Sequence, residues 1–280
     1  MKEKEPRKAK RHQAEKAYLN EAFLRSSDAR PLRMLAEYLE PRKRFDQFRI
    51  DDTIVFMGSA RVLSREQAEA GIRAAERGEG DPEQARRQLA MSRYYEDARE
   101  LARRFTDWSK QLTDEERRFV VCTGGGPGIM EAANRGASEA KGLNVGLTIS
   151  IPVEEFDNRY VTRELAFHFH YFFMRKFWFA YLAKALFVFP GGFGTLDELF
   201  EILTLRQTGK MSKPLVIVLF GTDYWNEVIN FEALVRHGTI SREDLQLFHV
   251  TDSVDEAFGI VTRHLTEFAL TERGAFLLEG

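Results

Sequence analysis

The chain has 280 residues, of which 44% are hydrophobic and 30% charged, a composition typical of an ordinary water-soluble globular protein. Its 41 basic and 43 acidic residues leave a net charge of −2, so bulk electrostatics predict neither a nucleic-acid nor a membrane partner. The single cysteine, Cys122, excludes an intrachain disulfide and a Cys-x-x-Cys metal site and suits a reducing compartment.

The amino-terminal region differs in composition from the rest of the chain. Residues 1–16 contain seven Lys or Arg and three Glu, which predicts a solvated tail, with weak nucleic-acid affinity as the lesser alternative. This tail lacks the apolar core of a signal peptide, and no later segment reaches the ~18 apolar residues of a membrane span. Apolar residues at three- or four-residue steps predict helix within 14–48, punctuated by Pro31 and Pro41. We therefore expect a cytoplasmic protein with a helical amino terminus.

Beyond residue 52, apolar strand-like runs alternate with helical segments. The expected strands are TIVFM, FVVCT, NVGLTIS, LAFHFHYF, ALFVF and PLVIVLF. The expected helices are a polar excursion over 64–91 broken at 77–84, SRYYEDARELARRFTDWSKQL, GIMEAANRGASEA, MRKFWFAYLA, LDELFEILTLRQ, and segments near 222–236 and 254–270. Several strands are apolar on both faces, which is typical of a parallel sheet covered by helices on each side. The sequence therefore predicts a Rossmann-like doubly wound α/β domain over 51–280, preceded by a helical extension over 1–50.

Three glycine-containing turns directly follow expected strands: GSAR at 58–61, TGGGPG at 123–128 and PGGFGT at 190–195. In a doubly wound sheet, ligands bind outside the carboxyl ends of the strands, so these turns should converge on one crevice. Glycine lets backbone amides face a ligand, and a helix amino terminus adds positive potential. The three turns together predict a phosphorylated ligand.

Each turn also has a plainer interpretation as a tight connection between a strand and a helix. The 123–137 segment is not a GxGxxG turn followed by an acidic residue after a second strand, so a dinucleotide is disfavoured. The chain has no GxxxxGK[ST] motif, so P-loop nucleotide hydrolysis is not supported.

The carboxylates after PGGFGT are ambiguous from spacing alone. Thr195 and Glu198 have the spacing of a capping box, in which Glu198 would only reach back to the helix amino terminus. The Asp197 carboxylate would then interact favourably with the helix dipole. Arg175 and Lys176 can equally be exposed basic residues that begin an aromatic helix. These residues leave open whether the carboxylates are structural or functional.

The segment PGGFGTLDE matches PGGxGTxxE, and an Arg-Lys dipeptide, Arg175-Lys176, lies upstream of it. In both features the chain resembles the LONELY GUY (LOG) family of nucleoside 5′-monophosphate phosphoribohydrolases, long labelled lysine decarboxylase-like. The resemblance runs from about Ile54 to Gln207, and residues 1–50 lie outside it. The chain looks similar to the longer bacterial branch of the family, and Met174 stands where compact members often have Glu.

This resemblance implies hydrolysis of the N-glycosidic bond of a nucleoside 5′-monophosphate, of the AMP or cytokinin riboside monophosphate type, to free base and ribose 5-phosphate. It implies a catalytic pair, Arg175 and Glu198, no metal or organic cofactor, and a homodimer or higher homo-oligomer. The substrate-binding residues that it implies are Ser59, Gly124, Gly125, Gly126, Gly128, Arg175, Lys176, Gly191, Gly192, Gly194 and Thr195.

Two other functions remain open at this point. A non-catalytic carrier or sensor of a phosphorylated nucleotide or pterin, such as molybdenum cofactor, would need the glycine turns but not the Arg-Glu pair. A pyridoxal-phosphate decarboxylase would need a lysine for the Schiff base, for which Lys176 and Lys184 are the candidates, but no partner for the pyridinium nitrogen can be identified.

Overall fold

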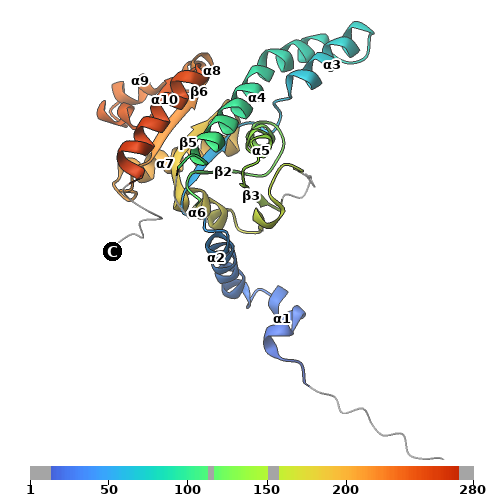
Figure 1. Cartoon of the computed structure of the whole chain (residues 1–280), viewed down its shortest axis with the longest axis vertical. Helices are drawn as coiled ribbons and strands as arrows, with labels where there is room; N and C mark the ends of the chain where they lie inside the picture. The colour runs from blue at the N-terminus through green and yellow to red at the C-terminus, as the bar shows by residue number, and fades with distance from the viewer. Residues whose placement is uncertain (1–13, 113–116, 151–157, 271–280) are drawn as a thin grey trace, which may run out of the picture.

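A seven-stranded parallel sheet in the order β4-β3-β2-β1-β5-β6-β7 forms the centre of the protein (Figure 1). The computed structural model describes residues 14–112, 117–150 and 158–270. The strands are β1 (Thr53–Met57), β2 (Val120–Thr123), β3 (Asn144–Ile149), β4 (Ala166–Phe169), β5 (Ala183–Val188), β6 (Val216–Phe220) and β7 (His249–Thr251). The chain moves outward from β1 to β4, then returns to pair β5 with the other side of β1. This reversal is the topological switch point of a doubly wound sheet, so the predicted α/β fold class is confirmed.

The central strands form because their sequences are apolar on both faces. Every residue of β1, β2, β5 and β6 is buried, whereas the edge strand β4 alternates between exposed and buried residues. Along β1, Ile54 and Phe56 face one core, and Val55 and Met57 face the other. The sheet therefore divides the interior into two hydrophobic layers, as expected for a parallel sheet covered on both sides.

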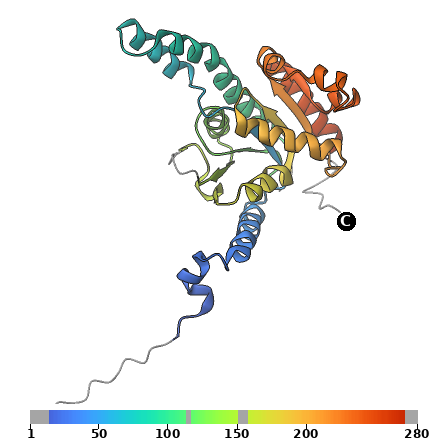
Figure 2. The same ribbon diagram turned by 180° about the vertical axis from the view of Figure 1, so that it is seen from behind.

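Helices cover both faces of this sheet. The helices α4 (Pro82–Ser109), α5 (Ile129–Glu139) and α10 (Val254–His264) lie on the face shown in Figure 1. The helices α6 (Phe172–Leu182) and α7 (Phe193–Gln207) lie on the opposite face, shown in Figure 2. The remaining elements are α3 (Arg65–Glu76), α8 (Thr222–Val228), α9 (Phe231–Arg236), η2 (Arg163–Leu165), η3 (Glu243–Leu247) and η4 (Leu265–Ala269). Within the described ranges, no helix combines the length and apolar character needed to cross a membrane.

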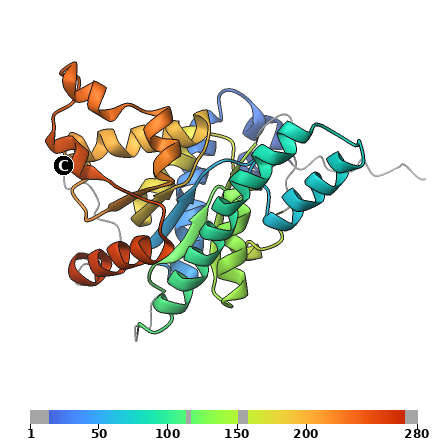
Figure 3. The ribbon, with the colours of Figure 1, turned by 90° about the horizontal axis from the view of Figure 1, so that it is seen from above.

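The long helix α4 begins earlier than its sequence predicts. The polar segment before Ser92 continues the helix back to Pro82, and α3 and α4 form the projecting hairpin of Figure 3. Asp81 caps the start of α4 by accepting a hydrogen bond from the Glu83 amide at 2.9 Å. The expected break at 77–84 is therefore confined to a shorter turn, because Pro82 is compatible with the first turn of a helix.

The amino-terminal extension consists of η1 (Ala17–Leu19), α1 (Glu21–Arg25) and α2 (Arg30–Gln47), and α2 leads into the sheet beside α6 (Figure 1). The expectation that Pro41 punctuates this region is wrong, because Pro41 lies inside α2. Proline cannot donate to the carbonyl four residues earlier, which here belongs to Glu37. The Trp178 indole Nε1 donates to that carbonyl oxygen at 2.9 Å. A tertiary hydrogen bond thus replaces the missing helical one.

Candidate functional site

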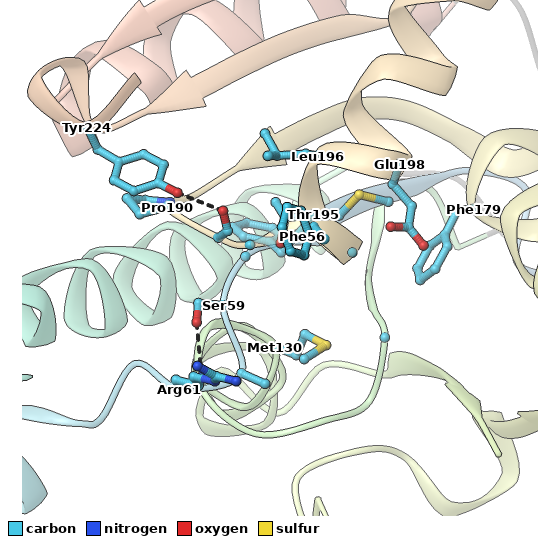
Figure 4. A pocket seen from close by; sticks show the side chains of 18 of the residues that line it. Phe56, Ser59, Arg61, Met130, Phe179, Pro190, Thr195, Leu196, Glu198 and Tyr224 are labelled. Carbon is cyan, nitrogen blue, oxygen red and sulfur yellow. Dashed lines mark hydrogen bonds between the residues drawn. The ribbon is translucent and has the colours of Figure 1, made fainter. Parts of the chain in front are cut away.

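The three glycine turns meet at a cavity of about 690 Å³ beyond the carboxyl ends of β1, β2 and β5 (Figure 4). Gly58 and Ser59 line it from the turn after β1, Gly124 from the turn after β2, and residues 190–195 from the turn after β5. A cavity of this size falls within the range of small-molecule and cofactor pockets, roughly 300–1,000 Å³. The topology therefore brings the expected phosphate-binding segments to one site.

Hydrogen bonds through Ser59 join the first turn to the other two. The Ser59 amide donates to the Pro190 carbonyl oxygen at 2.9 Å, and the Ser59 carbonyl oxygen accepts from the Ile129 amide at 3.2 Å. The Ser59 hydroxyl accepts from the Arg61 amide at 3.1 Å (Figure 4). On the far side, the Tyr224 hydroxyl donates to the Gly191 carbonyl oxygen at 2.7 Å. The site is consequently held by fixed backbone positions before any ligand enters.

Two glycines of PGGFGT have no structural requirement for glycine. A Cβ atom added at Gly192 or Gly194 would meet no atom within 4 Å, and neither residue has a positive φ. Both residues line the cavity. The helix α7 begins at Phe193. Its N-cap residue is Gly192, which has no side chain that could cap the helix. Its first amides and its dipole are therefore available to an anion.

The remaining glycine of this turn, Gly191, packs against Thr195. A Cβ added at Gly191 would lie 2.2 Å from the Thr195 hydroxyl oxygen, so the turn is closed by the contact between these two positions. Thr195 is buried and lies in the first turn of α7.

The glycines of TGGGPG have mainly structural roles. Gly125 and Gly128 have φ angles of 69° and 68°, which side-chain-bearing residues rarely adopt. A Cβ at Gly125 would lie 2.5 Å from the Thr148 Cγ2 atom, and one at Gly128 would lie 2.3 Å from the Ser59 carbonyl oxygen. Gly124 lines the cavity, whereas Gly125, Gly126 and Gly128 do not. This turn contributes to the site chiefly by permitting close approach of α5 to the turn after β1.

A substitution at Gly128 should therefore destabilise the fold. We expect Gly128→Ala to lower the free energy of unfolding by roughly 2–4 kcal/mol, because alanine would combine an unfavourable positive φ with a backbone clash. Urea denaturation measures the change. Gly126→Ala is the matched control, because its Cβ would meet only the flexible end of the Met130 side chain, with Cε at 2.8 Å and Sδ at 3.5 Å. Equal losses in the two variants would contradict this assignment.

Arg175 and Glu198 form an ion pair at the cavity wall. The Arg175 Nη2 atom lies 2.8 Å from the Glu198 Oε1 atom, and their side chains are only 13% and 8% exposed. The guanidinium carbon of Arg175 lies 5.3 Å from the ring centroid of Phe172 and 5.5 Å from that of Phe179. Burial raises the pKa of the Glu198 carboxyl above its ordinary value, although the Arg175 charge opposes this shift. The cavity thus contains a partly desolvated carboxylate held by a fixed cation.

The capping-box interpretation of Thr195 and Glu198 is wrong. Because α7 begins at Phe193, both residues lie inside the helix rather than at its N-cap and N3 positions. The Glu198 carboxylate accepts from Arg175 on the neighbouring helix. Glu198 is therefore directed toward α6 and the cavity.

Lys176 and Asp197 lie outside the cavity. The Lys176 Nζ atom is 2.7 Å from the Asp197 carboxylate and 2.8 Å from that of Glu201. Lys176, expected to contact substrate, instead links α6 to α7. Asp197, expected to interact with the helix dipole, forms this second bridge next to the Arg175–Glu198 pair.

Two substitutions at this outer bridge should shift the pKa of Glu198 in opposite directions. Lys176→Met should raise it by removing a nearby positive charge, and Asp197→Asn should lower it by removing a negative one. On acidification, the Glu198 carboxylate would then become protonated at a higher pH in Lys176→Met and at a lower pH in Asp197→Asn. Carbon-13 NMR of the labelled carboxyl group measures both values. Shifts of the same sign would contradict this electrostatic account.

Several cavity residues were missed by the sequence analysis. Tyr224 comes from α8, and nothing in the segment YWNEVI distinguishes it from an ordinary helical tyrosine. Arg61 lines the cavity from the turn after β1, and a basic residue at the end of a glycine turn was a usable signal. Met91, Met130 and Phe179 supply apolar surface. These five residues enlarge the site beyond the glycine turns and the ion pair.

A family model and a curated relative each match part of this chain. A family model described as "Possible lysine decarboxylase" matches residues 130–261. The probable cytokinin riboside 5′-monophosphate phosphoribohydrolase LOG4 of Oryza sativa subsp. japonica is 28% identical over 158 residues, which cover 56% of this chain and 67% of that protein.

Solved structures with related folds were also found. The X-ray structure of TM1055 is 20% identical, with a TM-score of 0.46, and the match covers 76% of this chain and 99% of that one. The molybdenum cofactor (Moco) carrier protein of Chlamydomonas reinhardtii is 18% identical, with a TM-score of 0.44 and coverage of 78% and 99%. The molybdenum cofactor binding protein of Rippkaea orientalis is 15% identical, with a TM-score of 0.43 and coverage of 76% and 95%.

The cavity does not fit the pyridoxal phosphate that a lysine decarboxylase would need. Such an enzyme holds its cofactor through a lysine Schiff base. Lys184 is fully buried in β5, with its Nζ atom 3.9 Å from the Asp52 carboxylate, and Lys176 is committed to the outer bridge. Among the described residues, no lysine lines the cavity, where the cations are Arg61 and Arg175. The decarboxylase function therefore has no suitable lysine at this site.

Proposed function

Because this chain belongs to the LONELY GUY (LOG) family, we propose that it is a phosphoribohydrolase that cleaves nucleoside 5′-monophosphates into free base and ribose 5-phosphate. One observation carries this proposal: a part-buried Arg175–Glu198 ion pair shares a cavity with the uncapped amino end of α7. The first feature suits a sugar carbon that becomes positively charged, and the second suits a phosphate.

The substrate phosphate binds at the start of α7 in this proposal. The amides around Gly192 and Gly194 approach its oxygens without obstruction, and the Thr195 hydroxyl is close to the same turn. Gly191 is fixed by its hydrogen bond from Tyr224, so the cradle is preformed. Ser59 and Gly124 line the adjoining wall, toward which the ribose extends. Fixing the phosphate positions the sugar, so remote binding energy contributes to the reaction.

Arg175 and Glu198 then act on the N-glycosidic bond. As the bond between C1′ and the base nitrogen breaks, its electron pair leaves with the base and positive charge develops at the sugar. The Glu198 carboxylate stabilises this charge and accepts a proton from the attacking water, by analogy with glycoside hydrolysis. Arg175 remains charged and donates hydrogen bonds to substrate oxygens or to the leaving base. The base takes up a proton, and the water oxygen is added to C1′.

Incubation with AMP, GMP, CMP and isopentenyl-AMP, followed by chromatography, tests this proposal. Release of free base together with ribose 5-phosphate from any of them supports it. The panel also reports the preferred base, which PGGFGTLDE and the Arg-Lys dipeptide do not specify. Tight nucleotide binding without release from all four would instead indicate a carrier or sensor.

We also propose that the protein forms a homodimer or higher homo-oligomer through the outer face of α7. Phe193 is 93% exposed beside the cavity, and Phe200 is 39% exposed further along the same helix. Both line a shallow groove on this face with Leu196 and Leu205. A second copy of the chain would remove this apolar surface from water. We expect Phe193→Asp to lower the molar mass measured by light scattering, and an unchanged mass would contradict this interface.

A further inference from the structure

The extension helix α2 contacts the amino end of α6 through Glu37. The Glu37 Oε1 atom accepts from the His170 amide at 2.8 Å, and its Oε2 atom accepts from the Tyr171 amide at 3.3 Å. The Glu37 carbonyl oxygen accepts from the Trp178 indole at 2.9 Å. One residue of the extension therefore binds α6 at its start and again near its middle.

These contacts form because the local sequence of α2 favours them. Pro41 has no amide hydrogen to donate to the Glu37 carbonyl, which leaves that oxygen free for Trp178. The neighbouring Tyr38 ring packs against Phe177 and Trp178, at centroid distances of 5.6 and 6.0 Å. The glutamate is thus held in place from both its backbone and the adjacent side chain.

Glu37 acts as a helix cap supplied from a distant part of the chain. Tyr171 is the N-cap residue of α6 and provides no side-chain cap of its own. A carboxylate at this end satisfies amides that lack helical partners and interacts favourably with the helix dipole. The Tyr171 carbonyl oxygen in turn accepts from the Arg175 amide at 3.2 Å. Two successive hydrogen bonds therefore connect Glu37 to the backbone of Arg175.

We propose that Glu37 is a positioning residue for Arg175, so that α2 is part of the catalytic unit. This inference rests on the proposed phosphoribohydrolase function. The first turn of α6 fixes where the Arg175 guanidinium meets Glu198, and Glu37 fixes that turn. The phosphate cradle on α7 lies outside this chain of contacts, so substrate binding should depend on Glu37 much less than turnover does.

Kinetics of Glu37 variants of the full-length chain test the proposal. We expect Glu37→Ala to lower kcat for AMP roughly tenfold to a hundredfold, because small displacements of a catalytic group have effects of this size. The KM should stay within about twofold if the phosphate cradle is unaffected. Glu37→Gln should give an intermediate kcat, because glutamine has one side-chain oxygen that can accept these hydrogen bonds, whereas glutamate has two.

Glu40→Ala is the matched control on the same helix. Glu40 pairs with Arg44 on α2, at 2.6 Å, and should be replaceable with little change in kcat. Thermal unfolding of all variants identifies any general loss of stability. A wild-type kcat in folded Glu37→Ala, or equal kcat losses in Glu37→Ala and Glu40→Ala, would overturn the inference.

Hydrogen exchange separates this inference from the proposed function. Without nucleotide, the amides of His170, Tyr171 and Arg175 should exchange faster in Glu37→Ala than in Glu40→Ala. If the wild type hydrolyses no nucleotide but this difference is present, the proposed function fails and the positioning of α6 by Glu37 stands. If the wild type hydrolyses AMP and Glu37→Ala changes neither exchange nor kcat, the inference fails and the function stands.

Discussion

Replacing Glu198 with glutamine should lower kcat for base release by roughly 10³-fold, a size typical of losing a general base that also stabilises charge. Glutamine keeps the shape of the side chain and an oxygen that can accept from Arg175. It carries no negative charge to stabilise the sugar cation and cannot take a proton from water. Because the phosphate is held by α7, the dissociation constant of AMP should change much less than kcat. Single-turnover kinetics and calorimetry measure the two quantities.

The matched control for this variant is Glu201→Gln. Glu201 lies on the same helix but pairs with Lys176 outside the cavity, so its replacement should leave most of the activity. If Glu198→Gln keeps more than about a tenth of the wild-type kcat, Glu198 has no direct role in proton transfer and charge stabilisation.

Replacing Gly194 with alanine should change stability and binding in opposite directions. Gly194 lies in the first turn of α7, and a Cβ there would meet no protein atom within 4 Å. Alanine should therefore stabilise the helix by up to about 1 kcal/mol. The same methyl group would enter the space where the phosphate approaches the amides, and we expect roughly 10²-fold weaker AMP binding from loss of charge-assisted hydrogen bonds.

Gly259→Ala is the control for Gly194→Ala. Gly259 lies within α10, far along the chain from the glycine turns, and a Cβ there would also meet no atom within 4 Å. Calorimetric melting should show that both variants are stabilised, whereas isothermal titration should show weaker AMP binding only for Gly194→Ala. Unchanged AMP binding in Gly194→Ala would exclude the amino end of α7 as the phosphate site.

The strands could be predicted from the sequence where both of their faces are buried. Strands β1, β2, β5 and β6 are buried along their whole length, and each is mainly apolar, with Lys184 in β5 as the charged exception. The edge strand β7 was missed, because it has three residues of which two are exposed, so neither an apolar run nor an alternation is visible. The convergence of the glycine turns followed from sheet topology alone.

Features determined by tertiary contacts could not be predicted in the same way. Pro41 continues α2 because Trp178, more than a hundred residues later, donates to the Glu37 carbonyl. The spacing of Thr195 and Glu198 fits a capping box, and only the start of α7 at Phe193 and the ion pair to Arg175 separate the alternatives. The family resemblance directed attention to that pair, whereas residue spacing did not.

Side-chain positions that depend on how separate helices pack were the least predictable. Lys176 is adjacent to Arg175 in sequence, but consecutive helical residues point in different directions, and its ammonium group reaches Asp197 and Glu201 instead of the cavity. Tyr224 reaches Gly191 only because β6 places α8 beside the turn after β5. Neither position follows from a local pattern.

Product analysis of AMP incubated with the wild type and with Glu198→Gln tests the central claim most directly. Liquid chromatography with mass spectrometry should detect adenine and ribose 5-phosphate in equal amounts from the wild type, and almost none from the variant. Intact nucleotide despite measurable binding, from AMP and equally from GMP, CMP and isopentenyl-AMP, would contradict the claim, as would adenosine and inorganic phosphate, because in neither case is the N-glycosidic bond cleaved.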